Sequence, residues 1–148
     1  MIFTEITKEE YEEYAKNHPL RSFFQTTSMA EVSSLKMWKS YYVGVKNENQ
    51  LIAASRIMSL KNRLGKNYFY APRGPLLDYE NKKLLKFFTQ NIKKYIKEKN
   101  GYVLHIDPLI IHKQRDIDGN IVQNGIDNTS IINSLKELRY KHFGFINH

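Results

Sequence analysis

The sequence predicts one α+β domain in which a mixed, mostly antiparallel sheet is flanked by helices. Two patterns carry this prediction: three strand-like segments follow one another in the middle of the chain, which indicates an antiparallel meander, and single helices separate the later strands. The chain has 148 residues, 41% of them hydrophobic and 13% aromatic, with only 7 Gly and 4 Pro. This composition supplies enough apolar surface for one packed core and excludes a largely disordered chain.

A short strand and a capped helix are predicted at the start of the chain. The strand covers Phe3 to Ile6. Thr7 and Glu10 stand three residues apart, which is the spacing of a capping box, so a helix is expected over Lys8 to Lys16. Pro19 ends this segment, because proline has no amide proton and its φ is fixed.

A second capping box predicts a second helix. Ser28 and Glu31 have the required spacing, and the helix is expected to run from Ser28 to about Lys36. Apolar residues recur along it at helical spacing: Met29, Val32 and Leu35.

A hairpin and a third strand are predicted for the middle of the chain. Trp38 to Lys46 and Leu51 to Ser59 are rich in β-branched and aromatic residues, and the polar turn Asn-Glu-Asn-Gln joins them. The third strand, Asn67 to Ala71, follows a turn around Gly65. Together the three segments form the expected meander.

The segment from Ala71 to Asp78 is predicted to be a rigid loop without regular structure. Its two prolines lack a backbone donor, and Gly74 permits backbone geometry that other residues avoid. The loop carries Arg73, whose planar guanidinium can hold a phosphate or a carboxylate through two hydrogen bonds. Because a stiff loop loses little entropy on binding, this segment is a candidate anion site. On residue types alone, Arg73 could equally pair with Asp78 or cap a helix.

Two helices and two strands are predicted for the last part of the chain. One helix covers Asn81 to Lys99, with lysines on one face and an apolar stripe on the other: Leu84, Leu85, Phe88, Ile92, Tyr95 and Ile96. A buried strand is expected over Tyr102 to Ile106, ending at Asp107-Pro108, and a helix from about Ser130 to Arg139. Phe143 to Ile146 begins another strand, so the chain is expected to be a piece of a longer protein.

The charge balance favours polyanionic partners. Lys and Arg number 23 against 15 Asp and Glu, a formal net charge of +8, and a positive field raises the local concentration of phosphates. Nucleic acid, an anionic membrane surface and a nucleotide-linked metabolite all fit this charge. Solubility alone would also explain it.

The residue inventory excludes several classes of protein. The absence of Cys excludes disulfides, thiolate metal sites and cysteine nucleophiles, and the five His lack the spacing of metal ligands, so no metal is expected. The first ten residues have no basic region followed by an apolar stretch, as a signal peptide would. No apolar run approaches the ~18 residues of a membrane span. A cytoplasmic location is therefore expected.

Several motifs together resemble one known family. Tyr-Ala-Pro-Arg-Gly-Pro at residues 70–75, a long Lys-rich helix and then a strand closing in Ile106-Asp107-Pro108 are similar to the Fem-type aminoacyltransferases, which build the interpeptide bridge of bacterial peptidoglycan. Phe24-Gln25 and the strand Tyr41 to Val45 fit the same family. The resemblance spans nearly all of the chain. It implies a GNAT-like (acyl-CoA N-acyltransferase) fold, with residues 1–148 as the first of two such domains.

The resemblance also implies an activity and its partners. An amino acid would move from aminoacyl-tRNA to the stem peptide of UDP-N-acetylmuramoyl-pentapeptide or of its lipid-linked form, with a peripheral membrane association in the second case. The chain would be the acceptor-binding domain, inactive as an isolated fragment. No cofactor is implied, because the aminoacyl-tRNA is a co-substrate.

The resemblance assigns roles to six residues. Lys36 and Trp38 match positions at the nucleotide diphosphate, and Asp107 matches an acidic residue that is a candidate catalytic base. The wall of the cleft is matched by Tyr70, Arg73 and Gly74. Each assignment has a structural alternative: Lys36 would complement a helix dipole, Trp38 would cover the core, and Asp107 would be a turn residue at a strand end.

Two other functions stay open. A non-catalytic RNA-binding module would use the net charge and the 10 Tyr and 8 Phe interleaved with lysine as a stacking platform. A small-molecule N-acetyltransferase would share the fold, although the Arg/Gln-x-x-Gly-x-Gly/Ala segment of acetyl-CoA enzymes is absent from the sequence. The rigid loop over Pro72 to Pro75 favours the aminoacyltransferase, because nonspecific RNA binding needs no pre-formed turn.

Overall fold

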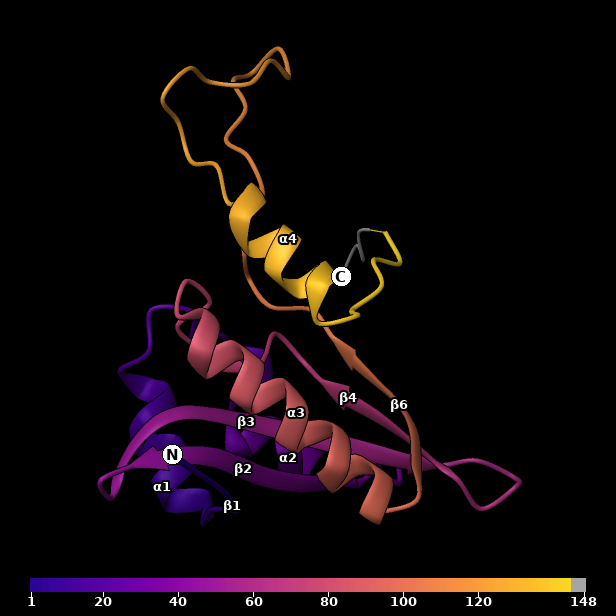
Figure 1. Ribbon diagram of the computed structural model, residues 1–148. Helices are drawn as coiled ribbons and strands as arrows, with labels where there is room; N and C mark the ends of the chain where they lie inside the picture. Colours follow the sequence, from indigo (N-terminus) through magenta and orange to yellow (C-terminus); the bar gives the residue numbers. More distant parts are fainter. Residues whose placement is uncertain (145–148) are drawn as a thin grey trace. The chain divides into compact units, whose positions relative to one another are not determined.

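The computed structural model describes residues 1–144 (Figure 1). The chain divides into two compact units, residues 1–109 and residues 110–148. The first unit holds a β-sheet and most of the helices: α1 (Lys8–Lys16), the 3-10 helix η1 (Phe23–Gln25), α2 (Thr27–Ser34) and α3 (Lys82–Glu98). The second unit holds α4 (Thr129–Glu137).

The sheet of the first unit is mixed and mostly antiparallel, as predicted. Its strands within the described residues are β1 (Ile2–Glu5), β2 (Lys39–Asn47), β3 (Gln50–Lys61), β4 (Asn67–Ala71), β5 (Leu76–Leu77) and β6 (Gly101–Ile106). The spatial order is β1-β2-β3-β4-β6, and β5 pairs with β3. The pair β4 and β6 is parallel and the other pairs are antiparallel. The predicted meander is therefore confirmed, with α3 as the crossover between β4 and β6.

The short strand β5 corrects the prediction that residues 71–78 contain no regular structure. Leu76 and Leu77 pair with Ala54 and Ala53 of β3. The two prolines precede these leucines, so neither removes a donor from the ladder. Because β4 also pairs with β3, the loop that carries Arg73 connects two strands held by the same neighbour.

The N-termini of α1 and α2 show which of the two predicted capping boxes form. The box at the start of α1 is confirmed: the Thr7 side chain accepts from the Glu10 amide, and the Glu10 side chain accepts from the Thr7 amide. The box predicted at Ser28 is wrong, since α2 begins at Thr27 and its N-cap is Thr26, whose hydroxyl accepts from the Met29 amide. Ser28 stands inside the helix that this earlier cap starts.

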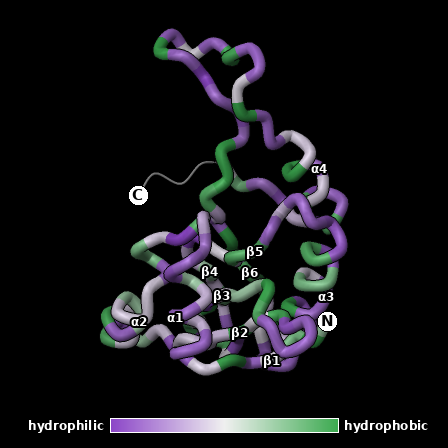
Figure 2. Tube along the Cα trace, turned by 90° about the vertical axis from the view of Figure 1, so that its left-hand side faces the viewer, coloured by the Kyte–Doolittle hydropathy of each residue, from purple (hydrophilic) through white to green (hydrophobic). Residues whose placement is uncertain are grey.

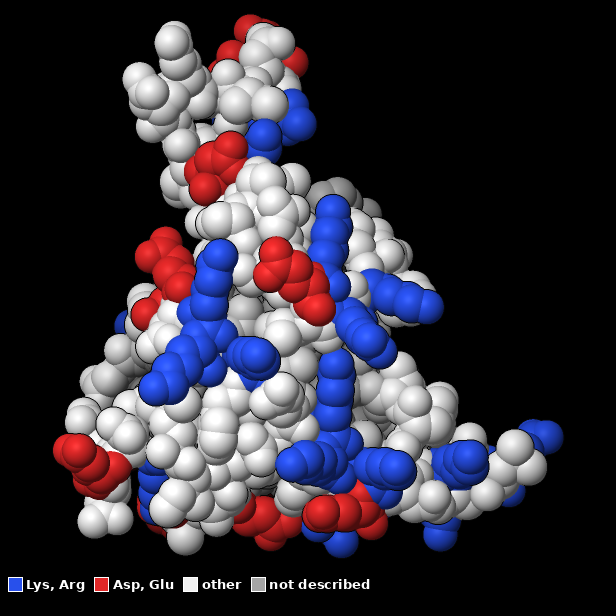
Figure 3. Space-filling model, in the orientation of Figure 1, with Lys and Arg blue, Asp and Glu red and all other residues white. Residues whose placement is uncertain are grey.

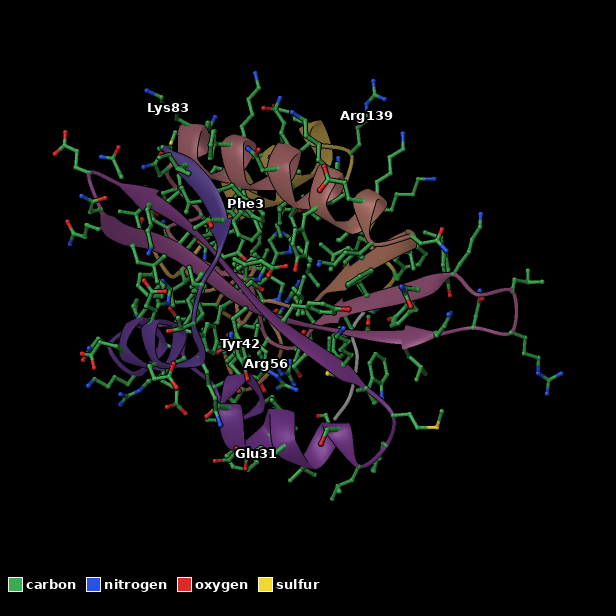
Figure 4. All side chains as sticks on the ribbon, turned by 90° about the horizontal axis from the view of Figure 1, so that it is seen from below. Phe3, Glu31, Tyr42, Arg56, Lys83 and Arg139 are labelled. Carbon is green, nitrogen blue, oxygen red and sulfur yellow. The ribbon has the colours of Figure 1, made fainter. Side chains whose placement is uncertain are left out.

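The amphipathic helix α3 packs on one face of the sheet. Its predicted stripe is buried except for Tyr95, which is half-buried. Phe88 is 2% exposed and Ile92 0%, and hydrophilic and hydrophobic residues alternate along the helix turns in Figure 2. Phe3 of β1 lies between the sheet and this helix (Figure 4) and meets Phe88 edge to face, with ring centroids 5.9 Å apart. Each such side chain contributes about 1.5–3 kcal/mol of burial free energy before entropy is subtracted.

Strand β6 is less buried than predicted. Tyr102 is 54% exposed, and the other residues of the strand are half-buried. The reason is topological: β6 ends the strand order of the described sheet, so it has a neighbouring strand on one side. A run of apolar residues does not distinguish a central strand from an edge strand.

The second unit contains α4 and the turns that precede it. The helix predicted from Ser130 to Arg139 is confirmed as α4, and one of the preceding turns is closed by the Gly119 amide, which donates to the carbonyl oxygen of Asp116 at 3.1 Å. A strand was expected over Phe143 to Ile146. Phe143 and Gly144 are not in a strand, and residues 145 and 146 lie outside the described part of the chain.

Candidate functional site

The loop between β4 and β5 is held by one carboxylate at the end of β6. The backbone N–H of Arg73 donates to Oδ1 of Asp107 at 2.5 Å, and the hydroxyl of Tyr70 donates to Oδ2 at 2.9 Å. Tyr70 and Asp107 meet because β4 and β6 are parallel, so their carboxyl ends lie at the same edge of the sheet. Three of the residues singled out in the sequence are therefore brought together.

The unusual backbone geometry of this loop occurs at Arg73 and not at Gly74, the residue that would permit it most easily. The φ of Arg73 is +52°, in the left-handed region, whereas Gly74 is not among the residues with positive φ. A left-handed non-glycine residue costs on the order of 1–2 kcal/mol. The hydrogen bond from the Arg73 amide to Asp107 offsets that cost. The side chain of Arg73 also lies near the end of β6, where its Nη1 is 3.8 Å from Oδ2 of Asp107.

A second clamp holds the loop from the other side. The side-chain Nε2 of Gln25 donates to the carbonyl oxygen of Arg73, and the Oε1 of the same amide accepts from the Ser22 amide at 2.8 Å. Gln25 is buried. A β-carbon added at Gly74 would lie 3.4 Å from Oγ of Ser55 and 3.6 Å from that Nε2, both ordinary contacts, so the space at this corner does not itself require a glycine.

The guanidinium of Arg73 makes a loose ion pair and keeps its donors available. Its Nη1 lies 3.8 Å from Oδ2 of Asp107, beyond hydrogen-bond distance. Its Cζ lies 5.8 Å from the centroid of the Phe24 ring. Among residues 1–144, no hydrogen bond from this guanidinium is found, and no ion pair with Asp78. Five N–H donors on a side chain that is 22% exposed form a suitable contact for an anion.

Both oxygens of Asp107 already accept protein hydrogen bonds. Burial, and after it the hydrogen bond to Asp107, raises the pKa of Tyr70 above its ordinary value, so the phenol remains a donor at neutral pH. The geometry therefore gives Asp107 a role in holding the loop. Its candidate role as a base stays a prediction.

Two groups of aromatic rings lie beside the site on β4 and β6, and the hydroxyl of Tyr68 links them because it lies 3.2 Å from Nδ1 of His105. Ring centroids lie 6.1 Å apart for Trp38 and Tyr68, 6.4 Å for Tyr68 and Tyr102, and 5.4 Å for Tyr70 and His105. Trp38 and Tyr70 are site residues that the family resemblance implies, whereas Tyr68, Tyr102 and His105 were not predicted. The sequence did contain a signal for Tyr68: it stands two residues before Tyr70 in β4, so both side chains point to the same face of the strand.

Lys36 stands apart from these contacts. It lies in the exposed turn after α2, which ends at Ser34, so Lys36 is not the last residue of the helix as expected. Within the described residues its side chain makes no hydrogen bond or ion pair. Its predicted contact with a diphosphate stays a prediction.

The basic surface gathers over α3. In the space-filling view of Figure 3 basic side chains stand over this helix, and its exposed lysines are Lys82, Lys83, Lys86, Lys93, Lys94 and Lys97. In the described part of the chain, no group of three or more acidic or His side chains could hold a metal ion. No helix there is long and apolar enough to cross a membrane.

Comparison with known sequences finds one family. The sequence pattern of the FemAB family matches residues 6–147. The aminoacyltransferase FemA of Staphylococcus aureus strain NCTC 8325 / PS 47 is 33% identical over 146 residues, which cover 98% of this chain and 34% of FemA. FemA of the bovine strain RF122 / ET3-1 is similar to the same extent. The chain therefore spans about a third of the length of the curated relatives it matches.

Comparison with solved structures finds the same family and a wider fold. The crystal structure of FemX superimposes with a TM-score of 0.80 at 26% identity, covering 99% of this chain and 33% of that one. A probable acetyltransferase gives 0.62 at 12% identity, covering 100% of this chain and 95% of its own. An aminoglycoside 6'-N-acetyltransferase from Acinetobacter haemolyticus gives 0.57 at 10% identity, covering 100% and 96%. These two show the fold alone, and it is the expected GNAT-like one.

Proposed function

The chain belongs to the FemAB family, and on this basis we propose that it is the acceptor-binding domain of an aminoacyltransferase. The proposed enzyme moves an amino acid from aminoacyl-tRNA to the stem peptide of a peptidoglycan precursor. The acceptor is UDP-N-acetylmuramoyl-pentapeptide or its lipid-linked form. The name of the relative FemA, an aminoacyltransferase, supports this activity.

Membership of the FemAB family also underlies our proposals for the domain organisation, the co-substrate and the cellular location. The chain is the first of two GNAT-like domains and is inactive on its own, because relatives of this sequence are about three times as long. Aminoacyl-tRNA is the co-substrate and no further cofactor takes part. The enzyme works in the cytoplasm, with a peripheral membrane association if the acceptor is lipid-linked.

The observation that carries the proposal is the Arg73 loop. Its guanidinium donates no hydrogen bond within residues 1–144, and the backbone of Arg73 is held on both sides, by Asp107 and by Gln25. Such a pre-organised cation loses little entropy when it binds a diphosphate through charge-assisted hydrogen bonds. The aromatic side chains of Tyr70, His105, Tyr68 and Trp38 lie beside it and supply apolar contact area for the remainder of a sugar-nucleotide ligand.

The acceptor amine has to be neutral before it can react. A Lys-like amine with a pKa near 10.4 is neutral in about one molecule in 2,500 at pH 7, which costs roughly 4.6 kcal/mol. The neutral nitrogen attacks the ester carbonyl, an amide bond forms, and the ribose oxygen of the tRNA leaves with a proton. A carboxylate such as Asp107 could accept the proton of the amine, an effect typically worth 10²–10⁴-fold. Holding the two substrates together can supply ~7–11 kcal/mol, so positioning dominates.

Substitution of the two cations tests the proposal. In the full-length protein, Arg73→Ala and Lys36→Ala should each weaken binding of UDP-N-acetylmuramoyl-pentapeptide by ~1.5–3 kcal/mol, about 10- to 150-fold in calorimetric titration. Arg63→Ala is the matched control, because Arg63 is exposed in the turn between β3 and β4. Thermal melts should stay close to those of the wild type. Unchanged affinity in both variants would refute the assignment.

A further inference from the structure

A buried arginine, Arg56, lies on β3, the central strand of the sheet, which pairs with β2, β4 and β5. Arg56 is in the middle of β3 and is 2% exposed. Figure 4 shows its side chain beside Tyr42, between the sheet and α2. A buried charge is expensive unless strong partners compensate it.

The partners of Arg56 are neutral. Its Nη1 donates to the carbonyl oxygen of Phe24 at 2.7 Å, and its Nη2 lies 3.1 Å from the hydroxyl of Ser33 and 3.5 Å from the carbonyl oxygen of Met29. No ion pair of Arg56 is found within residues 1–144, and its Nε has no hydrogen-bond partner there. A well-packed apolar side chain would fill such a place at lower cost, so stability alone does not account for an arginine.

The contacts of Arg56 lead directly to the Arg73 loop. The carbonyl that accepts its shortest hydrogen bond belongs to Phe24, whose ring lies under the guanidinium of Arg73. The next residue, Gln25, donates to the Arg73 carbonyl. One short segment, η1, is therefore anchored to β3 through its backbone and holds the loop through its side chains.

We propose that Arg56 is a positioning residue: it anchors η1 so that Phe24 and Gln25 hold the Arg73 loop in the geometry that receives an anion. The part of this inference that concerns ligand affinity rests on the proposed function, and the part that concerns the loop does not. Arg56 touches no reacting atom and acts through Arg73.

Amide hydrogen exchange followed by NMR measures the loop without any ligand. In Arg56→Lys, which keeps the charge and loses the planar fork, exchange of the Arg73 amide should become at least 10-fold faster. The Val43 amide in β2 should change less than twofold. Equal acceleration at both amides, or none at Arg73, would overturn the inference, because a purely structural residue acts through global unfolding. If the lysine variant does not fold, Arg56→Met removes the same hydrogen bonds together with the buried charge.

Two control variants separate the anchor from its surroundings. Arg63→Lys makes the same chemical change in an exposed turn and should leave the Arg73 amide unaffected. Ser33→Ala removes one acceptor of Arg56 and keeps the bond to Phe24, so it should also leave that amide within twofold. Acceleration at Arg73 in Ser33→Ala as large as in Arg56→Lys would contradict the route through Phe24.

A double-mutant cycle tests the ligand part in the full-length protein, with UDP-N-acetylmuramoyl-pentapeptide as the probe. Arg56→Lys should weaken binding about 10-fold in the wild-type background and less than twofold in the Arg73→Ala background. Equal losses in both backgrounds would overturn the positioning role. If Arg73→Ala itself leaves affinity unchanged, the proposed function fails, and the exchange measurement alone decides the role of Arg56.

Discussion

The two faces of the sheet are built from different kinds of side chain. The face that α3 covers holds large apolar side chains, Phe69 and Ile57 on the sheet and Phe88 and Ile92 on the helix, all fully or almost fully buried, with the small polar side chains of Ser55 and Ser59 between them. The opposite face carries Arg56, together with Tyr70 and the carboxylate that holds the Arg73 loop. Alternation along each strand separates the two sets, since successive side chains point to opposite faces.

The polar face leaves hydrogen bonds unmade. Buried side-chain atoms without a partner in residues 1–144 are the hydroxyl of Tyr11, the hydroxyl of Ser40 and Nε of Arg56. Ser40 and Arg56 both lie on the face opposite α3, and Tyr11 comes from α1, which packs on that face. Unpaired buried polar groups cost free energy, so this face carries a stability cost that the α3 face does not. The difference indicates that the groups that hold the site lie on the face opposite α3, which also has a small apolar cluster around Tyr11 and Ala54.

The largest expected effect is the loss of a core ring on the α3 face. Phe88→Ala should reduce the free energy of unfolding by about 3–5 kcal/mol, measured by urea denaturation, because the cavity cannot refill. Phe143→Ala removes the same ring from an exposed position and should change it by less than ~0.5 kcal/mol. Binding of the acceptor well below the melting temperature should stay within twofold. A large loss of affinity in the folded Phe88 variant would break the division between the faces.

Loss of the carboxylate on the polar face should have a smaller effect on stability and a larger one on binding. Asp107→Asn removes charge-assisted bonds to Tyr70 and to the Arg73 amide and should destabilise by ~1.5–3 kcal/mol. Tyr70→Phe, which removes only one of those bonds, is the matched comparison and should cost less.

Exchange of the Arg73 amide distinguishes the two roles of Asp107. If Asp107 holds the loop, the amide exchanges faster in the asparagine variant and acceptor affinity falls. If Asp107 acts only as a base, turnover falls while affinity and exchange are unchanged, and the anchoring role is then wrong.

The outer surface of α3 should bind RNA weakly and without selectivity. Its lysines supply charge with no ordered base-reading surface, so binding of poly(U) should weaken steeply between low and physiological salt. Lys93→Gln with Lys94→Gln should flatten the dependence of log K on log salt, as seen in fluorescence titrations. RNA affinity that persists at physiological salt, without any response to the muropeptide nucleotide, would favour the RNA-binding module instead.

The smallest effect is expected from His18, at the end of α1. Burial lowers the pKa of His18 below its ordinary value, an effect that Asp78 partly opposes. The unfolded state therefore binds the proton more tightly, so stability is full above the unfolded pKa of about 6.5 and falls as the pH drops through the folded value. His18→Gln should flatten this fall between pH 7 and pH 5 in thermal melts. If the decrease of the melting temperature between pH 7 and pH 5 is the same in the variant, groups other than His18 cause the loss of stability in acid.

The sequence by itself determined the elements whose signals are local. The capping box at Thr7, the hairpin between β2 and β3 and the buried stripe of α3 all depend on residues a few positions apart, and all were predicted. Local competition also explains the error at Ser28, where an equivalent cap at Thr26 begins the helix earlier. The family was recognisable for a similar reason, since its motifs are short and keep their order along the chain.

Only the tertiary structure decided the partners within the site. Asp107 lies 34 residues from Arg73, Gln25 lies 48 residues from it, and Phe24 lies 32 residues from Arg56. The residue types do not distinguish Asp107 from Asp78 as the partner of Arg73, because each is an aspartate that can pair with an arginine. The parallel pairing of β4 with β6 brings one of them to the loop. Which polar groups meet is a property of strand order and register, and those depend on the packing of the whole sheet.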